Sequence, residues 1–448
     1  MQNYYAGNPL NRLSYLRSSP AFLASALRSP KSRFILLDSL AVLVEPETEQ
    51  DPARHIATVG WTDVEAYIGD AEKVFKGVDG KKDDDFAELA VLGEGGKQFG
   101  KETVGQLTHE EKRQYFINQP AFVFLGVDER SAPASAQSLP LTKPDEHSTL
   151  ETHSPHGIPY WAMDISRYKD LKAKVLAEER QGKKREFGDL RAGSQTIPGD
   201  EAAIAAEARA LVDWNTRNRF CPSCARPLRS VWGGWKRQCI PGEPAADGIP
   251  ADPPCLTKKG VHNTSYPRTD PVVIMAVLSP DREKILLGRQ RSWPAKFYSC
   301  LAGFIESAES FEEAVKREVY EEAGIVLETV GYHSSQPWPY PSSLMLGAWG
   351  VAKEGQTIRC DLDNELEDAR YFTRAEVLKV IDANNPLLLT QRQLAKMDGN
   401  AGAQQEKSEA EKAGKEEPLF RMPPSTAIAN TLITAWARGT LFQPGSKI

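Results

Sequence analysis

Residues 303–325 read GFIESAESFEEAVKREVYEEAGI, and this stretch decides the fold. Its second half predicts a helix, because Ser310 followed by Glu313 has the form of a capping box and apolar residues then recur at helical spacing. Gly324 stands where helices commonly end in a left-handed residue. Such a helix carries three glutamates on one face of a single turn: Glu318, Glu321 and Glu322.

The crowded carboxylates indicate a cation site. Like charges three or four residues apart on a helix repel each other by about 0.2–0.5 kcal/mol per pair. A divalent cation that prefers oxygen ligands, Mg²⁺ or Mn²⁺, would offset this repulsion. The alternative interpretation is an acidic helix face that only meets solvent.

The same residues resemble the Nudix box, the signature of the Nudix hydrolase family, at every defined position. The matching positions are Gly303, Glu309, Arg317, Glu318, Glu321, Glu322 and Gly324, with apolar Val319 and Ile325. The resemblance implies an α+β fold with a mixed sheet sandwiched between helices. It also implies an enzyme that uses divalent cations to cleave a nucleoside diphosphate linked to another group.

Within the box, the resemblance assigns a role to each charged residue. Glu318 and Glu322 would bind the catalytic metal, and Glu321 would be a further ligand or the base that orients water. Arg317 would hold the carboxylates in place, and Glu309 would brace the loop before the helix. Which glutamate acts as the base stays open.

Outside the box, the resemblance adds two metal-binding positions. Ala302 would offer its backbone carbonyl, and Glu365 would be a third metal-binding glutamate. Glu367 and Asp368 stand close to Glu365 in the sequence and are alternatives for that role.

A second signature, SQPWPYPSS, occupies residues 335–343. Prolines alternating with aromatic residues fix φ and discourage helix, which predicts a stiff extended loop with little entropy to lose on binding. This array resembles the one that marks NADH pyrophosphatases, which usually have Phe where this chain has Tyr340. A proline-rich turn with core aromatics is the alternative. The resemblance implies substrate contacts for Gln336, Pro337, Trp338, Pro339, Tyr340, Pro341, Ser342 and Ser343.

The subfamily resemblance implies substrate contacts at three more positions. Tyr266 would contact the substrate, Phe304 would stack on a base or nicotinamide ring, and Ala429 would line the pocket. The implied activity is hydrolysis of the diphosphate of NAD(H) to NMN(H) and AMP. ADP-ribose, diadenosine polyphosphates and NAD-capped RNA are alternative substrates, and a nucleotide-sensing module without catalysis is the alternative of another class.

Four of the six cysteines fall within 35 residues and predict a structural zinc site: Cys221, Cys224, Cys239 and Cys255. Four thiolates around Zn²⁺ would stabilise a segment too short for its own core. His262 is an alternative fourth ligand, and free reduced cysteines are the other interpretation. The subfamily resemblance implies a zinc ribbon, with Ala225 at a position where glycine is usual. A left-handed φ at Ala225 would cost about 1 kcal/mol.

These signals predict three parts of the chain. Residues 1–213 would form a Nudix-like α/β domain that supports a homodimer, and residues 214–265 the zinc ribbon. Residues 266–448 would form the catalytic Nudix domain, with a disordered insertion near 397–417.

Charge and hydropathy limit the partners. The 448 residues carry a formal net charge of −6, which argues against a general polyanion binder and leaves NAD-capped RNA as the nucleic acid considered. No apolar run approaches the roughly 20 residues that span a bilayer, so no membrane partner is expected. The last residues, Ser446-Lys447-Ile448, resemble the Ser-Lys-Leu signal that a peroxisomal import receptor reads. A peroxisomal location is expected, with the cytoplasm as the alternative.

Overall fold

The structure is a computed structural model that divides the chain into two compact units, described separately below. The C-terminal unit comprises Met1–Gly7, Arg191–Gln195 and Thr269–Ile448, and the N-terminal unit comprises Asn8–Leu190 and Thr196–Arg268. The described residues are 2–46, 53–69, 71–75, 121–132, 157–177, 184–192, 196–240, 253, 255, 257, 265–383 and 419–442. The expected insertion near 397–417 and the tripeptide at 446–448 lie outside them, and the expected boundaries at 213 and 265 stay predictions.

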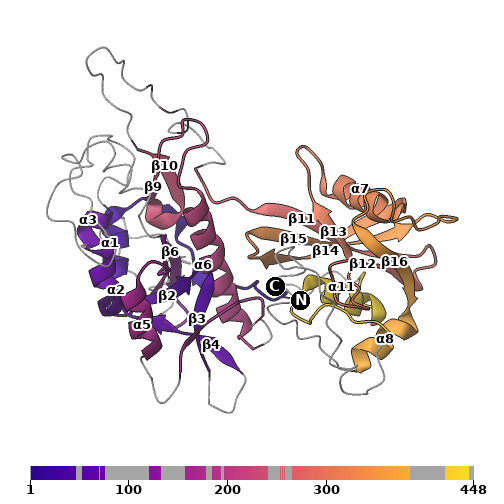
Figure 1. The fold of residues 1–448 in the computed structure, drawn as a ribbon, viewed down its shortest axis with the longest axis horizontal. Helices are drawn as coiled ribbons and strands as arrows, with labels where there is room; N and C mark the ends of the chain where they lie inside the picture. Colours follow the sequence, from indigo (N-terminus) through magenta and orange to yellow (C-terminus); the bar gives the residue numbers. More distant parts are fainter. Residues whose placement is uncertain are drawn as a thin grey trace. The chain divides into compact units, whose positions relative to one another are not determined.

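The C-terminal unit contains a six-stranded sheet in the order β14-β15-β11-β12-β16, with β13 paired to β11 (Figure 1). Strands β11 and β15 are parallel and the other pairs are antiparallel, so the sheet is mixed. The strands are β11 (Asp270–Leu278), β12 (Lys284–Gln290), β13 (Leu301–Phe304), β14 (Leu327–Trp338), β15 (Ser343–Ala352) and β16 (Leu366–Thr373).

Helices cover both faces of this sheet, because β11 sends alternate side chains to opposite faces. Val273, Met275 and Val277 pack against apolar residues of α7 (Phe311–Ala323). The intervening apolar residues, which begin at Ile274, pack against α8 (Arg374–Asp382) and α11 (Ile428–Ala437). Figure 1 shows α7 on one side of the sheet and the other two helices on the other side. The predicted α+β fold, with a mixed sheet between helices, is confirmed.

The ends of α7 follow the local sequence signals. The Ser310 side chain accepts a hydrogen bond from the Glu313 amide, and the Glu313 carboxylate accepts one from the Ser310 amide. Gly324 ends the helix with φ 68°. The capping box and the glycine therefore begin and end the helix where the sequence predicts.

The N-terminal unit is built on an eight-stranded sheet in the order β1-β6-β7-β2-β3-β4, with β5 on β2 and β8 on β3. Its buried core surrounds Trp161, whose ring stacks on that of Phe122 with centroids 4.8 Å apart. The strands are β1 (Leu10–Asn11), β2 (Arg33–Asp38), β3 (Ala41–Pro46), β4 (Arg54–Ile56), β5 (Thr58–Val59), β6 (Phe122–Asp128), β7 (Ile158–Asp164) and β8 (Glu186–Gly188). The helices are η1 (Ser14–Leu16), α1 (Pro20–Arg28), α2 (Trp61–Ile68), α3 (Ala71–Val74), α5 (Lys169–Ala177) and α6 (Gly199–Arg217).

A small antiparallel hairpin completes the N-terminal unit. It consists of β9 (Leu228–Val231) and β10 (Lys236–Cys239), joined by η7 (Trp232–Gly234). Within the part of the chain that the structure describes, no helix has the length and apolarity needed to cross a bilayer.

Candidate active site

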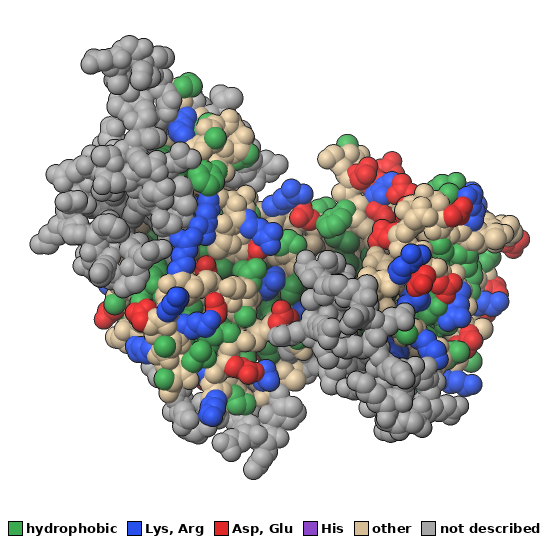
Figure 2. All heavy atoms as spheres, in the orientation of Figure 1, with side chains coloured by type: hydrophobic (Ala, Val, Ile, Leu, Met, Phe, Trp, Pro, Cys, Tyr) green, Lys and Arg blue, Asp and Glu red, His purple; other side chains and the backbone are tan. Residues whose placement is uncertain are grey.

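The carboxylates of α7 share one face of the helix but differ in exposure. Glu318 and Glu322 keep 9% and 2% of their surface exposed, whereas the Glu321 side chain is 47% exposed. Glu322 Oε1 accepts a hydrogen bond from the amide of Ala302 on β13, at 3.3 Å. Figure 2 shows acidic side chains gathered over α7, whose first turn adds Glu312 and Glu313.

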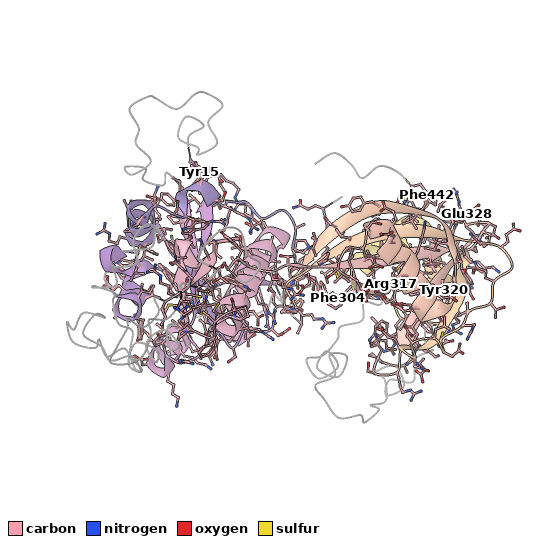
Figure 3. The ribbon with its side chains drawn as sticks, turned by 90° about the horizontal axis from the view of Figure 1, so that it is seen from above. Tyr15, Phe304, Arg317, Tyr320, Glu328 and Phe442 are labelled. Atoms are coloured by element: carbon pink, nitrogen blue, oxygen red, sulfur yellow. The ribbon has the colours of Figure 1, made fainter. Side chains whose placement is uncertain are left out.

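Arg317 connects these carboxylates to the loop before the helix. Its guanidinium donates to both oxygens of Glu309, at 2.7 and 2.9 Å. It also donates to Glu318 and Glu321, at 2.8 and 2.9 Å. A fifth hydrogen bond, of 2.8 Å, reaches the carbonyl of Phe304 at the end of β13 (Figure 3). One side chain therefore fixes the helix, the loop and the strand relative to one another.

Gly303 is glycine because the Glu318 carboxyl group fills the space beside it. A Cβ built at Gly303 would lie 2.0 to 2.2 Å from the carboxyl atoms of Glu318. Real Cβ contacts this short do not occur, so any other residue would displace the carboxylate.

Of the three acidic candidates after the box, Glu365 is the one coupled to the helix. Its charge helps to raise the pKa of both Glu318 and Glu322, and its own carboxylate accepts a 2.7 Å hydrogen bond from Gln290. The two alternatives have other partners. Glu367 pairs with Arg289, and Asp368 accepts a hydrogen bond from the Tyr298 hydroxyl.

Asp363 is a member of this acidic group that sequence reasoning missed. Its charge contributes to the raised pKa of Glu322 and Glu365, and its carboxylate accepts a hydrogen bond from the Glu365 amide at 2.9 Å. The signal in the sequence was its position two residues before Glu365.

The electrostatics of the acidic group suit a divalent cation. Burial, followed by the charges of Glu365 and Glu318, raises the pKa of Glu322 to about 9. Burial also raises the pKa of Glu318, although Arg317 opposes the shift. Ionised carboxylates crowded in this way require a compensating positive charge, and their oxygen atoms are the ligands that Mg²⁺ and Mn²⁺ prefer.

The carboxylates are more widely spread than a closed metal cage. Among the described residues, the four cysteines are the only group of three or more potential ligands whose ligand atoms all lie within 4.8 Å of one another. Mg²⁺ commonly keeps several waters and takes only one or two protein carboxylates, so an open acidic group fits this ion.

The 335–343 array is partly strand rather than loop. Residues up to Trp338 belong to β14, and Ser343 begins β15. The Gln336 side chain is 1% exposed, and its amide oxygen accepts from the Ile428 amide at 2.8 Å. Its amide nitrogen donates to the carbonyls of Tyr4 and Thr426, both at 2.9 Å. The Gln336 side chain therefore makes its hydrogen bonds within the protein, and its contact with the substrate stays a prediction.

The remaining predicted substrate positions differ in exposure. Phe304 keeps 61% of its surface exposed at the end of β13, so its ring is accessible to a planar group (Figure 3). Ala429, on α11, is buried in the core cluster. Tyr266 belongs to the N-terminal unit, where its ring lies 5.9 Å from that of Trp232 and Lys236 lies above both rings. The substrate roles of the three stay predictions.

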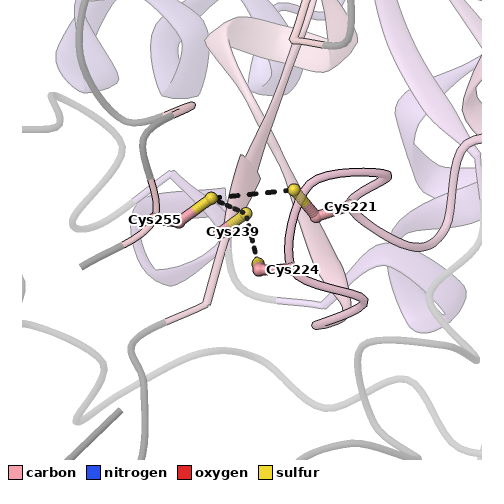
Figure 4. Close-up of side chains that lie close together, drawn as sticks. All are labelled: Cys221, Cys224, Cys239 and Cys255. Atoms are coloured by element: carbon pink, nitrogen blue, oxygen red, sulfur yellow. Dashed lines mark hydrogen bonds between the residues drawn. The ribbon is translucent and has the colours of Figure 1, made fainter. Parts of the chain in front are cut away.

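The four cysteines converge beside the hairpin of the N-terminal unit (Figure 4). The Sγ separations are 3.7 Å for Cys221 and Cys255, 3.7 Å for Cys224 and Cys239, and 3.4 Å for Cys239 and Cys255. A tetrahedron with Zn–S bonds of about 2.3 Å has edges of about 3.8 Å, whereas a disulfide is about 2.05 Å long. The thiols therefore fit a tetrahedral zinc ion.

Two further residues, Ala225 and Thr257, lie beside the cysteines. Ala225 has φ 57°, so the left-handed strain expected at this position is present. Thr257, which sequence reasoning missed, places its hydroxyl 2.9 Å from Cys255 Sγ. His262 lies outside the described residues.

Fold and site together define a hydrolase of the Nudix class, with a carboxylate helix held against a mixed sheet. Comparison with known families agrees: residues 268–399 match the NUDIX domain, and residues 31–214 match the NADH pyrophosphatase-like rudimentary NUDIX domain. The chain belongs to the Nudix hydrolase family, in its NADH pyrophosphatase subfamily.

Three relatives indicate the range of activities named in this subfamily. An NAD-capped RNA hydrolase of Schizosaccharomyces pombe is 33% identical, and the match covers 85% of each chain. The human NAD-capped RNA hydrolase NUDT12 is 32% identical over 98% of this chain and 74% of its own length. The human mitochondrial NAD(P)H pyrophosphatase NUDT13 is 32% identical over 56% of this chain and 59% of its own.

Proposed function

We propose that this chain hydrolyses the diphosphate of an NAD group at the 5′ end of RNA, releasing NMN and leaving a 5′-monophosphate. The sequence by itself favours free NADH, with NAD-capped RNA among the alternatives. The relatives favour the alternative, because the two named for NAD-capped RNA match 85% and 98% of this chain. The relative named for NAD(P)H matches only 56% of it. Free NAD(H), which contains the same diphosphate, is the second candidate substrate.

The acidic group that α7 forms with Glu365 is the observation that carries this proposal. Mg²⁺ or Mn²⁺, held by Glu318, Glu322 and Glu365, would offset the charge of the diphosphate and lower the pKa of a bound water. Arg317 keeps Glu318 and Glu321 oriented through its hydrogen bonds. Glu321 is the most exposed of the four box glutamates, so it is the one best placed to take a proton from an attacking water.

The substrate preference is tested by comparing four substrates with the purified full chain and Mg²⁺. NAD-capped RNA is followed on gels, and NADH, NAD and ADP-ribose are followed by chromatography of the products. We expect the highest kcat/KM for NAD-capped RNA. Rapid cleavage of NADH with intact capped RNA would instead assign the free dinucleotide, and rapid cleavage of ADP-ribose alone would reject both.

The metal site is tested with a matched pair of variants. Glu318→Gln should lower kcat at least 100-fold for whichever substrate is cleaved, because it removes a charged oxygen ligand. Glu328→Gln is the control, since Glu328 is an exposed residue that lies away from Arg317 (Figure 3). Equal activities of the two variants would contradict the assignment.

Zinc, the dimer and the cellular location are further parts of the proposal. We expect about one zinc ion per chain by elemental analysis, and its loss when Cys221 and Cys224 are replaced by Ser.

Light scattering tests the homodimer. A fluorescent protein fused before residues 439–448 should enter peroxisomes, and removal of Ser446-Lys447-Ile448 should leave it in the cytoplasm.

A further inference from the structure

A short segment at the start of the chain belongs to the C-terminal unit. Residues 2–7, here called the N-terminal segment, group with the Nudix domain, whereas the residues from Asn8 onward group with the other unit. Two of its side chains are almost fully buried: Asn3 keeps 5% of its surface exposed and Tyr5 keeps 2%. A segment of six residues has no core of its own, so this burial is supplied by the Nudix domain.

Asn3 attaches the segment to the strand that leads into the 335–343 array. Its side-chain amide nitrogen donates to the carbonyl of Ser335 at 2.8 Å and to the hydroxyl of Ser334 at 3.1 Å. Its amide oxygen accepts from the hydroxyl of Thr431 on α11, at 3.2 Å. All of these partners lie more than 300 positions away in the chain.

Tyr5 contacts the aromatic residues of the array directly. Its ring packs edge-on against Trp338 and Tyr340, with centroids 6.1 and 6.3 Å apart. Its hydroxyl lies 3.1 Å from the hydroxyl of Tyr340. The guanidinium of Arg191, also part of this unit, lies 5.5 and 5.7 Å from the Trp338 and Tyr340 rings.

The hydroxyl of Tyr340 is the group that distinguishes this chain from the usual Phe of the subfamily array. In this structure that hydroxyl is used within the protein, because it meets Tyr5. The backbone of the segment contributes as well, since the carbonyl of Tyr4 accepts from the buried amide of Gln336.

We propose that the N-terminal segment holds the 335–343 array in its binding conformation, and that Tyr5 and Asn3 are positioning residues for substrate binding. The inference rests on the proposed function in assigning the array to the substrate. Ordering the rings before the substrate arrives reduces the entropy lost on binding. The described contacts of Asn3 and Tyr5 do not include the α7 carboxylates, so their loss should affect KM rather than kcat.

The activity test is a double-mutant cycle between the two hydroxyls. Tyr5→Phe and Tyr340→Phe each keep the ring and remove one hydroxyl, and each should raise KM for the cleaved substrate about two- to fivefold, with kcat within twofold. The double variant should be no worse than either single variant, because the two changes remove the same interaction. Tyr15→Phe, at a 53% exposed tyrosine of the other unit, is the control and should leave KM unchanged. Additive effects, or an unchanged KM in both single variants, would overturn the proposal.

A second measurement does not depend on any substrate. Hydrogen–deuterium exchange of peptides covering residues 332–346 should be faster in Asn3→Ala and Tyr5→Phe than in the parent and in Tyr15→Phe. Unchanged exchange in both variants would reject the supporting role, whatever the activity. If the parent cleaves none of the four substrates while exchange still rises, the proposed function fails and the supporting role of the segment stands.

Discussion

At the scale of single residues, the site depends on carboxylates that the fold forces close together. Glu322 is almost fully buried, and burial followed by the charges of Glu365 and Glu318 raises its pKa to about 9. In the absence of a cation, this carboxyl group therefore carries a proton at neutral pH. Binding of a divalent cation must displace that proton, so metal affinity is expected to rise with pH.

The raised pKa predicts how metal-free stability depends on pH. Between the usual value of 4.5 and about 9, the folded state binds a proton that the unfolded state does not, so stability falls as the pH rises. The slope is at most about 1.4 kcal/mol per pH unit. A glutamine does not ionise, so the stability of Glu322→Gln should not fall with pH in this way. Its unfolding free energy at pH 8 without Mg²⁺ should exceed that of the parent by about 1–3 kcal/mol.

Urea unfolding at pH 6, 7, 8 and 9 measures this difference in samples that retain zinc. The exposed Glu328→Gln should follow the parent at every pH. Added Mg²⁺ should stabilise the parent and not Glu322→Gln. Parallel curves for the parent and Glu322→Gln across this range would contradict the predicted protonation.

Ala225 gives a second prediction at this scale. Its φ of 57° is left-handed, which costs a residue with a Cβ about 1–2 kcal/mol. Ala225→Gly removes this strain but adds freedom to the unfolded chain, so we expect a net gain of up to about 1 kcal/mol in the unfolding free energy of the N-terminal unit. Urea unfolding of the zinc-loaded protein measures it. Ala203→Gly in α6 is the control and should lose about 1 kcal/mol, and a similar loss at position 225 would contradict the prediction.

At the scale of elements, the site is the contact between one helix and one strand. Helix α7 begins at its capping box and ends at Gly324. Strand β13 approaches it so closely that its glycine lies against the Glu318 carboxyl group. Arg317 then joins the helix to the end of that strand. The geometry of the carboxylates is therefore a property of the two elements together.

Gly303→Ala tests this contact. The added methyl group would overlap the Glu318 carboxyl group, which must move, and we expect kcat/KM or metal affinity to fall about 10- to 100-fold. The change in melting temperature should be small, because a side chain rather than backbone has to shift. Gly199→Ala is the control, since a Cβ there meets nothing within 4 Å. Activity of Gly303→Ala equal to that of the parent would show that the carboxylate position is not critical.

At the scale of the whole molecule, the chain combines a Nudix domain with a rudimentary one, and the cysteine group follows the rudimentary domain in the sequence. Its formal net charge of −6 means that the protein as a whole does not attract polyanions. If NAD-capped RNA is the substrate, as proposed, its recognition would come from the cap and few backbone phosphates, rather than from the length of the RNA.

This charge predicts a weak dependence of RNA binding on salt. Each phosphate neutralised on a single strand adds about 0.7 to the slope of log affinity against log salt. With about two phosphate contacts, raising NaCl from 50 to 200 mM should weaken binding of NAD-capped RNA by about tenfold or less. Fluorescence anisotropy with the Glu318→Gln variant, which is expected to cleave slowly, measures it, and NAD alone serves as the reference ligand. A loss of 1,000-fold would indicate an extended RNA-binding surface.

The sequence by itself determined the parts of this protein that depend on local spacing. The capping box, the helix end at Gly324 and the placement of Glu318 and Glu322 on one face all follow from contacts between residues a few positions apart. The left-handed φ of Ala225 was expected for another reason, because the subfamily resemblance places a usual glycine at this position. Helical periodicity and turn geometry are local, so a linear pattern is sufficient to predict them.

Only the tertiary structure decided which distant residues meet. It places the charge of Glu365 near Glu322, whereas Glu367 pairs with Arg289 and Asp368 accepts a hydrogen bond from Tyr298. The metal-binding role of Glu365 stays a prediction. The tertiary structure also brought Asn3 to Ser335 across 332 positions of chain. Contacts of this kind depend on how the strands pair and the helices pack, so they cannot be predicted from the periodicity of the sequence.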